Sequence, residues 1–252
     1  MEGPSLKLAE EQMRPLRGRI VREASGNTKV GAARYVGKEV TDIFSWGKHL
    51  VFQFPDEAVR IHFMLFGTYE AEIEGVVVTG DYRRAREPRL SFSFENGEVL
   101  MFNCSVKPIE SKNAKGDYDF SIDILSRKWD RQKVLALLAK QGDEEVADVL
   151  LDQDIFAGVG NIIKNEVLSI VRQNPRTKIG ALTKKQREEL VDTTRAFSKQ
   201  FLAWRRKFVL RKNLKVHGRG TCPYCGGKLT KEKTGRRGRW SYWCPTDQPL
   251  RS

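Results

Sequence analysis

Three patterns of hydrophobic and polar positions follow one another along the chain. Apolar residues first recur at three- and four-residue spacing just after Pro4, which predicts a helix over residues 6–16. Between residues 19 and 109, short β-branched and aromatic runs such as HLVFQF and RLSFSFENG are separated by Gly and Asn-Gly turns. This alternation is typical of the strands of a β-sandwich, which we expect to end near residue 120.

Helical periodicity then replaces the strand pattern. It runs through RQKVLALLAK, EEVADVLL and NIIKNEVLSIV, and through residues 183–204, which open with Thr183 and Gln186 in capping-box register. Beyond residue 205 the helical pattern gives way to Gly, Cys and Arg. The sequence therefore predicts an α+β protein with an N-terminal β-sandwich flanked by helices over residues 1–120, a helical domain over 121–215 and a short C-terminal domain over 216–252.

The charge is concentrated at the C-terminal end. The 252 residues carry a net charge of +13, and residues 205–252 hold 14 Lys and Arg against 2 Asp and Glu. Such a basic segment indicates a nucleic-acid partner. With 40% hydrophobic residues and no long uncharged run, the chain is expected to be globular and to have no membrane partner.

The N-terminal stretch MEGPSLKLAEEQ lacks the basic start and apolar core of a signal peptide. We therefore expect a reducing location, cytoplasmic and nucleoid-associated. In that environment the four cysteines are interpreted as metal ligands or buried thiols rather than as disulfides.

Three of the cysteines have the spacing of a metal site. Cys222, Cys225, Cys244 and Asp247 form a C-x2-C-x18-C-x2-D pattern, which predicts two knuckles around a structural, tetrahedral Zn²⁺ joined by a β-hairpin. His217 is the alternative fourth ligand. Cys104 lies in a strand-like run far from the others and is interpreted as a small core residue.

Two further segments indicate binding of phosphate. The hairpin between the knuckles carries Arg236, Arg237 and Arg239 beside aromatic residues, a combination that can neutralise phosphates in a groove. Residues 150–168, LLDQDIFAGVGNIIKNEVL, predict a helix that ends near Gly158, a tight turn and a new helix from Asn161. A helix N-terminus at that point can bind an anion, and an ordinary packing corner between two helices explains the same pattern.

The segment at 150–168 also resembles the helix–two-turn–helix signature of the formamidopyrimidine-DNA glycosylase and endonuclease VIII family. Three other stretches agree with this resemblance in family order: EGP at the N-terminus, SWGKHL around Lys48, and the C-terminal zinc finger preceded by KVHGRGTCPYC. The resemblance implies a base-excision-repair enzyme that excises oxidised bases, cuts the abasic strand by β,δ-elimination and binds damaged double-stranded DNA. We expect it to act as a monomer.

The resemblance assigns catalytic roles to three residues. Met1 stands where the family usually has Pro, and its α-amine has an ordinary pKa low enough to be partly nucleophilic near neutral pH. Because Glu2 is bulky, we expect Met1 to be retained. Glu2 matches the general acid that protonates the sugar ring oxygen, and Lys48 matches the strand-borne Lys that contacts the phosphates of the lesion.

It also implies how DNA is held. Gly160, Asn161, Lys48, Arg237 and Arg239 correspond to the DNA-binding set, which bends the strand so that a nucleotide can be flipped out.

The space left by the flipped nucleotide should be filled by an apolar wedge. HFMLFG aligns with the intercalation loop and offers Met64, Leu65 and Phe66. The alternative is that these three residues belong to the core of a strand, although three bulky residues in succession cannot all face one side. His62 is interpreted as structural.

Two absences favour the endonuclease VIII branch and hence oxidised pyrimidines. The segment over residues 204–215 is shorter than the loop that covers a flipped purine in the other branch, and NCSVKPIE lacks that branch's Arg-x-Phe pair. Because the usual Pro is replaced, two alternatives stay open: an enzyme with only lyase activity, and a lesion-binding protein without chemistry.

Overall fold

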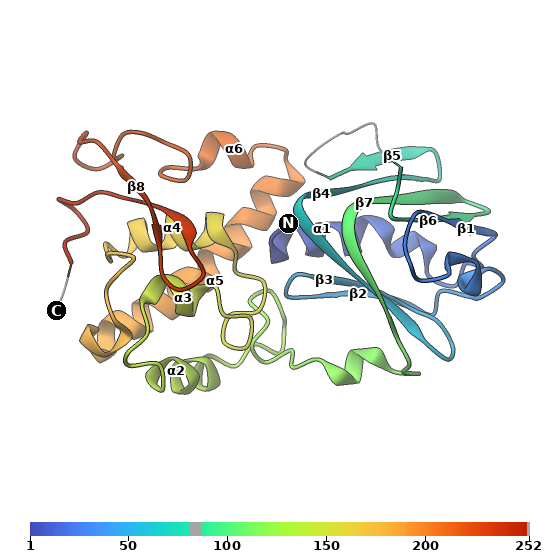
Figure 1. The fold of residues 1–252 in the computed structure, drawn as a ribbon, viewed down its shortest axis with the longest axis horizontal. Helices are drawn as coiled ribbons and strands as arrows, with labels where there is room; N and C mark the ends of the chain where they lie inside the picture. Colours follow the sequence, from blue (N-terminus) through green and yellow to red (C-terminus); the bar gives the residue numbers. More distant parts are fainter. Residues whose placement is uncertain (81–86, 251–252) are drawn as a thin grey trace. The chain divides into compact units, whose positions relative to one another are not determined.

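The computed structural model describes residues 1–80 and 87–250. The chain divides into two compact units, Met1–Asp119 and Phe120–Ser252 (Figure 1). Unit 1 contains the strands β1 to β7, and unit 2 contains the helices α2 to α6 and the hairpin β8–β9. Within the described ranges, no helix combines the length and the apolar character that a membrane span requires.

Unit 1 is built on one antiparallel sheet of seven strands. Their hydrogen-bonded order is β1-β6-β7-β4-β3-β2, with β5 beside β4. The strands are β1 Glu23–Ser25, β2 Asp42–Trp46, β3 His49–Gln53, β4 Ala58–Ile73, β5 Val76–Thr79, β6 Leu90–Phe94 and β7 Gly97–Ile109.

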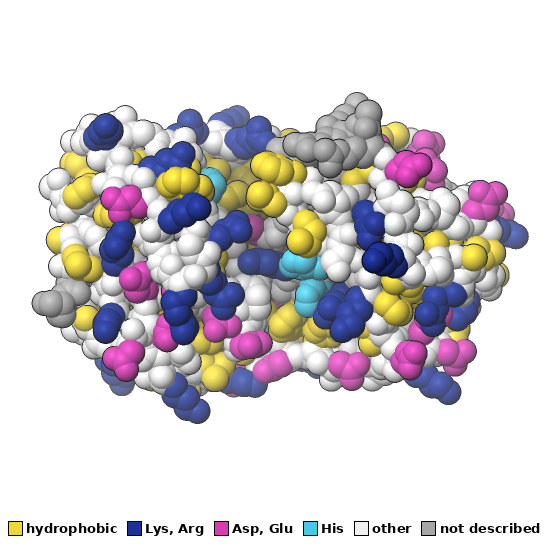
Figure 2. Space-filling view, in the orientation of Figure 1, with side chains coloured by type: hydrophobic (Ala, Val, Ile, Leu, Met, Phe, Trp, Pro, Cys, Tyr) yellow, Lys and Arg dark blue, Asp and Glu magenta, His cyan; other side chains and the backbone are white. Residues whose placement is uncertain are grey.

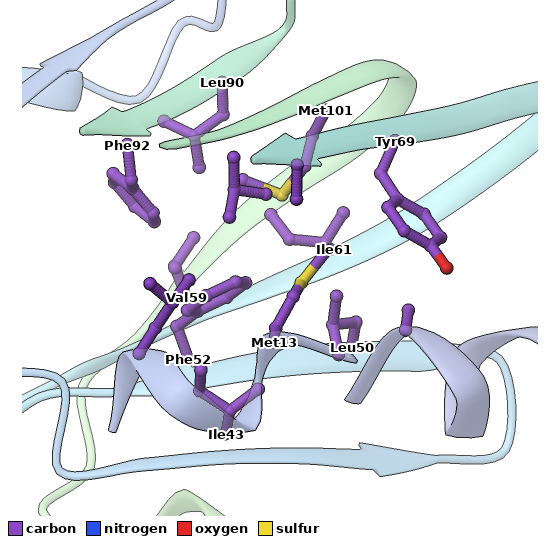
Figure 3. Close-up of a cluster of buried hydrophobic side chains, with 14 of the residues drawn as sticks. Met13, Ile43, Leu50, Phe52, Val59, Ile61, Tyr69, Leu90, Phe92 and Met101 are labelled. Atoms are coloured by element: carbon purple, nitrogen blue, oxygen red, sulfur yellow. The ribbon is translucent and has the colours of Figure 1, made fainter. Parts of the chain in front are cut away.

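This sheet folds over on itself to make the expected sandwich. Phe52 on β3 and Phe92 on β6 are separated by two strands in the order, yet their ring centroids lie only 5.6 Å apart. In a flat sheet, three steps between strands would place them roughly 14 Å apart, so the two halves must face each other. Figure 3 shows Leu90 and Phe92 on one side of this core, Ile43 and Phe52 on the other, and Met13 between them.

The first helix of unit 1 begins earlier than the sequence pattern predicts. Helix α1 covers Gly3–Met13, and a 3-10 turn, Arg14–Leu16, continues it. Glu2 is the extended N-cap residue, and Pro4, whose ring is compatible with the first turn, allows the helix to start before Leu6. The predicted apolar face is confirmed, because Leu6, Met13 and Leu16 are fully buried.

Unit 2 packs helices around α4 and α5. The capping box at Thr183 is confirmed: its hydroxyl accepts a hydrogen bond from the Gln186 N–H, and the Gln186 side chain accepts one from the Thr183 N–H. The elements are α2 Arg131–Ala139, α3 Val146–Leu150, α4 Asn161–Ile170, α5 Lys184–Arg206, α6 Leu210–Asn213, β8 Thr230–Thr234 and β9 Arg239–Trp243.

The prediction of a helix ending near Gly158 is wrong, because α3 ends at Leu150. Asp152 competes for the backbone there: its carboxylate accepts from the Asp154 N–H at 3.0 Å and forms a local turn. The Gln153 side chain then joins both ends of the loop, donating to the carbonyl oxygens of Leu151 and Val159 and accepting from the Gly158 N–H. Two successive turns therefore lead into α4.

Candidate active site and metal centre

The N-terminal residue is anchored in the core of unit 1. The Met1 side chain packs against the hydrophobic cluster of the sandwich, and its Cε would lie 2.9 Å from a Cβ placed on Gly80. Glu2 is buried, and its carbonyl oxygen accepts from the Ser5 N–H at 2.9 Å as α1 begins. The α-amine of Met1 is therefore held at the start of a helix by a side chain that fills a defined space.

Lys48 lies in the two-residue turn between β2 and β3. The expectation that Lys48 lies within a strand is therefore wrong. Gly47 precedes it with φ of +53°, the conformation that a type II′ hairpin turn requires at its first central position. The turn places the Lys48 carbonyl oxygen 3.1 Å from Nδ1 of His62, which donates to it.

His62 connects the predicted catalytic groups of unit 1. Burial lowers the pKa of His62, and the positive charges of the N-terminal amine, Lys48 and Arg60 lower it further against the opposing effect of its hydrogen bond to Lys48. The interpretation of His62 as purely structural missed this position, because a single His in a strand has no pattern of its own. One imidazole is therefore hydrogen-bonded to the Lys48 carbonyl oxygen and is influenced by the charge of the Met1 amine.

His49 extends the same cluster. Its ring lies 5.5 Å from that of His62 and 5.7 Å from that of Trp46. Burial, together with the charges of Arg60 and His62, lowers the pKa of His49 to about 3. Both histidines are therefore neutral near neutral pH.

The predicted wedge is exposed. Met64, Leu65 and Phe66 have 50%, 66% and 46% of their surface accessible, and the register between β4 and β7 shifts between Phe63 and Thr68. Phe66 has φ of +63° and Asn103, on β7, has φ of +48°. This bulge turns all three apolar side chains out of the core, so the alternative that they are core residues is wrong.

In unit 2 the turn before α4 is hydrogen-bonded to the β8–β9 hairpin. Gly160 is the N-cap residue of α4 and Asn161 its first residue, whose amide Nδ2 donates to the carbonyl oxygen of Trp240 at 2.9 Å. The same carbonyl accepts from the Lys164 ammonium, which is completely buried and also donates to the Ser241 hydroxyl at 2.7 Å. These bonds fix β9 against α4.

The hairpin arginines differ in their surroundings. Arg236 forms an ion pair with Glu144 at 2.7 Å, and Arg237 lies 3.8 Å from Asp152. Arg239 is exposed and forms no ion pair within residues 1–80 and 87–250. Of the three, Arg239 is the one whose charge no carboxylate among these residues offsets, and its role in binding DNA stays a prediction.

The turn of the hairpin is held by a buried acid that the sequence analysis missed. Asp148 on α3 accepts from the backbone N–H groups of Arg236 and Arg237, at 2.6 and 3.2 Å. The carboxylate is almost completely buried. Nothing in the local pattern of α3 reveals this role, because its partners lie almost ninety positions further along the chain.

The four predicted zinc ligands cluster. One ligand atom from each of Cys222, Cys225, Cys244 and Asp247 lies within 4.8 Å of the others. The thiols of Cys225 and Cys244 are 3.5 Å apart, and the Cys222 sulfur is 2.9 Å from an Asp247 carboxylate oxygen. Sulfurs about 3.8 Å apart are expected around a tetrahedral Zn²⁺, so this donor set fits the metal.

His217, the alternative fourth ligand, and Cys104 both lie outside this cluster. Nδ1 of His217 accepts a hydrogen bond from the Asn165 amide at 2.9 Å, and its ring packs on Tyr242, so His217 is not in the cluster. Cys104 is buried in the core of unit 1, where desolvation raises the pKa of its thiol to about 12. It is the expected small core residue.

The folded-over sheet and the helical turn belong to a fold that the chain shares with solved structures of formamidopyrimidine-DNA glycosylases. The structure of *Lactococcus lactis* formamidopyrimidine-DNA glycosylase, bound non-covalently to DNA containing an abasic site, matches with a TM-score of 0.83 and 19% identity, covering 99% of this chain and 100% of that one. No family model matches the sequence.

Curated relatives agree with the fold. Endonuclease 8-like 3 of *Mus musculus* is 33% identical over 203 residues, which are 79% of this chain and 33% of that protein. Endonuclease 8-like 2 of *Mus musculus* is 32% identical over 207 residues, which are 76% of this chain and 58% of that protein. The chain belongs to the formamidopyrimidine-DNA glycosylase and endonuclease VIII family. It spans a third of the first relative's length and somewhat over half of the second's.

Proposed function

We propose that the protein is a base-excision-repair DNA glycosylase with abasic-site lyase activity, acting on oxidised bases and preferentially on pyrimidines. The observation that carries this proposal is the position of His62, which donates a hydrogen bond to the Lys48 carbonyl oxygen at 3.1 Å and whose pKa is lowered by the charges of the Met1 amine and Lys48. Cations gathered in this way suit a phosphate backbone. The similarity to endonuclease 8-like proteins supports the same reaction class.

The first step forms a bond between the Met1 nitrogen and the sugar C1′ while the glycosidic C1′–N bond breaks. The base leaves with the bonding electrons and takes up a proton. Glu2 then protonates the ring oxygen as the C1′–O4′ bond opens, which leaves a protonated imine on Met1. Met1 supplies a primary amine, so this imine must keep its proton to act as an electron sink.

Strand cleavage follows from that imine. Removal of a C2′ proton expels the 3′ phosphate by β-elimination, and a second proton loss expels the 5′ phosphate by δ-elimination. Lys48, in the turn beside His62, is proposed to contact the phosphates and assist these proton transfers. Water hydrolyses the imine and returns the free amine.

The remaining residues are proposed to hold the damaged duplex. Asn161 and Arg239 bind the phosphates of the damaged strand, and Leu65 with its neighbours fills the space that the flipped nucleotide leaves. A structural Zn²⁺ held by Cys222, Cys225, Cys244 and Asp247 would fix the base of the hairpin that carries Arg239.

Borohydride trapping tests the proposed chemistry. The protein is incubated with duplexes carrying an abasic site or thymine glycol, reduced, and digested for mass mapping, with intact-mass analysis to establish that its chain begins at Met1. A cross-link on the Met1 peptide is the expected result. A cross-link on the Lys48 peptide would contradict Met1 as nucleophile and leave a lyase, whereas binding without a cross-link would leave a lesion-binding protein.

A further inference from the structure

Helix α5 ends in a residue that does not suit its backbone. The N–H groups of Phe208 and Val209 donate to the carbonyl oxygens of Arg205 and Trp204, each at 3.0 Å, which is the pattern of a Schellman motif. Phe208 occupies the left-handed position of this motif, with φ of +56°. Glycine usually fills that position, because a side chain there crowds the backbone.

The Phe208 side chain is also exposed. It is 74% accessible, the largest fraction among the bulky apolar side chains of residues 1–80 and 87–250. Burial of the ring in the core would offset the backbone strain of a left-handed phenylalanine, but the Phe208 ring is not buried. Local strain combined with apolar exposure points to a ligand and not to folding as the reason for this residue.

Cations flank the ring on both sides in the chain. Arg206 and Lys207 precede it, Arg211 and Lys212 follow it on α6, and all four are exposed. Residues 205–215 contain no Asp or Glu. Figure 2 shows Lys and Arg side chains over the α6 segment. The charge is therefore complementary to a polyanion, which disfavours an apolar protein partner.

We propose that Phe208 stacks on an unpaired base of a DNA strand while the four cations, Arg206, Lys207, Arg211 and Lys212, contact the phosphates on either side. An exposed aromatic ring between cations is the arrangement by which proteins bind single-stranded nucleic acid without sequence preference. The proposal deepens the proposed function, on which it rests for the presence of DNA. It adds a contact to unpaired DNA that the duplex-binding residues do not supply.

Fluorescence anisotropy with a mixed-sequence single-stranded oligonucleotide and the matched duplex tests this contact. We expect F208A to weaken single-strand binding about tenfold, which corresponds to about 1.4 kcal/mol, and F208W to retain the affinity. The dependence of binding on salt should be unchanged in F208A and reduced in the K207Q/K212Q double variant. V76A is the control, because Val76 is an exposed apolar residue on β5 close to Glu72 and Glu74.

Equal single-strand affinity of F208A and the wild type would overturn the inference, as would a loss in F208W as large as that in F208A. F208G lacks the ring but has no backbone strain at this position. If F208G binds single-stranded DNA as weakly as F208A does, the weaker binding comes from loss of the ring and not from misfolding. Borohydride trapping on an abasic duplex is measured on the same wild-type preparation. If the wild type is trapped on the abasic duplex but F208A binds single-stranded DNA normally, only this inference fails. If F208A binds more weakly but the wild type is not trapped, only the proposed function fails.

Discussion

The side-chain amide of Asn103 donates a hydrogen bond of 2.6 Å to the carbonyl oxygen of Leu65. This bond crosses from β7 to the bulge in β4 and fixes the most exposed of the three wedge residues from behind. Asn103 itself has a left-handed backbone, which Asn tolerates better than most residues.

We therefore predict that N103A slows base excision from duplex DNA about tenfold, because a loosened wedge stabilises the flipped state less well. Cleavage of single-stranded abasic DNA, which has no stacked space to fill, should change much less. N103G shows whether a slower N103A has lost the hydrogen bond or has a strained backbone, because Gly adopts the left-handed conformation easily and lacks the amide. Excision by N103A at the wild-type rate would contradict the role of this bond.

The position of Met1 can be disturbed without changing Met1. A Cβ on Gly80 would lie 2.4 Å from Thr68 Oγ1 and 2.9 Å from Met1 Cε, so G80A must displace the side chain that anchors the amine. We expect the rate of borohydride trapping to fall about tenfold, because small misplacements of a nucleophile are costly. G31A is the matched control, since a Cβ on Gly31 meets open space. An equal fall of the trapping rate in G80A and G31A would contradict the role of the Met1 side chain in positioning the amine.

The fourth metal ligand is tested by metal analysis. We expect the wild type to contain about one zinc per chain, D247A to lose most of it and D247C to restore it. H217A should keep its zinc, because Nδ1 of His217 is bonded to Asn165. Zinc loss in H217A together with retention in D247A would reverse the assignment.

Acid should destabilise unit 1 through His49. The pKa of His49 is about 3 in the folded protein, below its ordinary value of 6.5, because burial and neighbouring charges oppose protonation. The unfolded chain therefore binds the proton first, so this stability is complete above about pH 6.5 and is lost as the pH falls towards 3.

H49F keeps an aromatic ring against Trp46 and removes the titration. Urea unfolding between about pH 7 and 4.5 should show a smaller loss of unfolding free energy in H49F than in the wild type. Parallel pH profiles of the two proteins would be incompatible with a neutral, buried His49.

Strain at Phe208 can be measured as stability. Replacing it by Gly should raise the free energy of unfolding by about 1 kcal/mol, because Gly adopts the left-handed position without the cost of a Cβ. F208A removes the same aromatic ring but keeps the Cβ, so its gain should be smaller. If F208A and F208G are equally stabilised, the exposed ring and not the strained backbone is what lowers the free energy of unfolding.

Much of this architecture could be predicted because its causes are local. The capping box at Thr183 and the spacing of Cys222 and Cys225 each depend on residues within one or two turns of chain. His62 beside Lys48, and Asp148 beneath Arg236, depend instead on contacts between distant segments, which no periodicity encodes. The end of α3 was misplaced for a related reason, since the Asp152 side chain overrides an apolar pattern that continues past it.

The hairpin of unit 2 is fastened at two places by different chemistry. Three thiols and a carboxylate gather at its base, whereas the Asp148 carboxylate holds its turn through hydrogen bonds from backbone N–H groups, which involve no cysteine. Arg239 lies at the start of β9, next to that turn, and Cys244 follows the end of the strand. Oxidation of the cysteines would therefore act first on the end of the hairpin remote from Arg239, while the Asp148 bonds still hold the turn beside that cation.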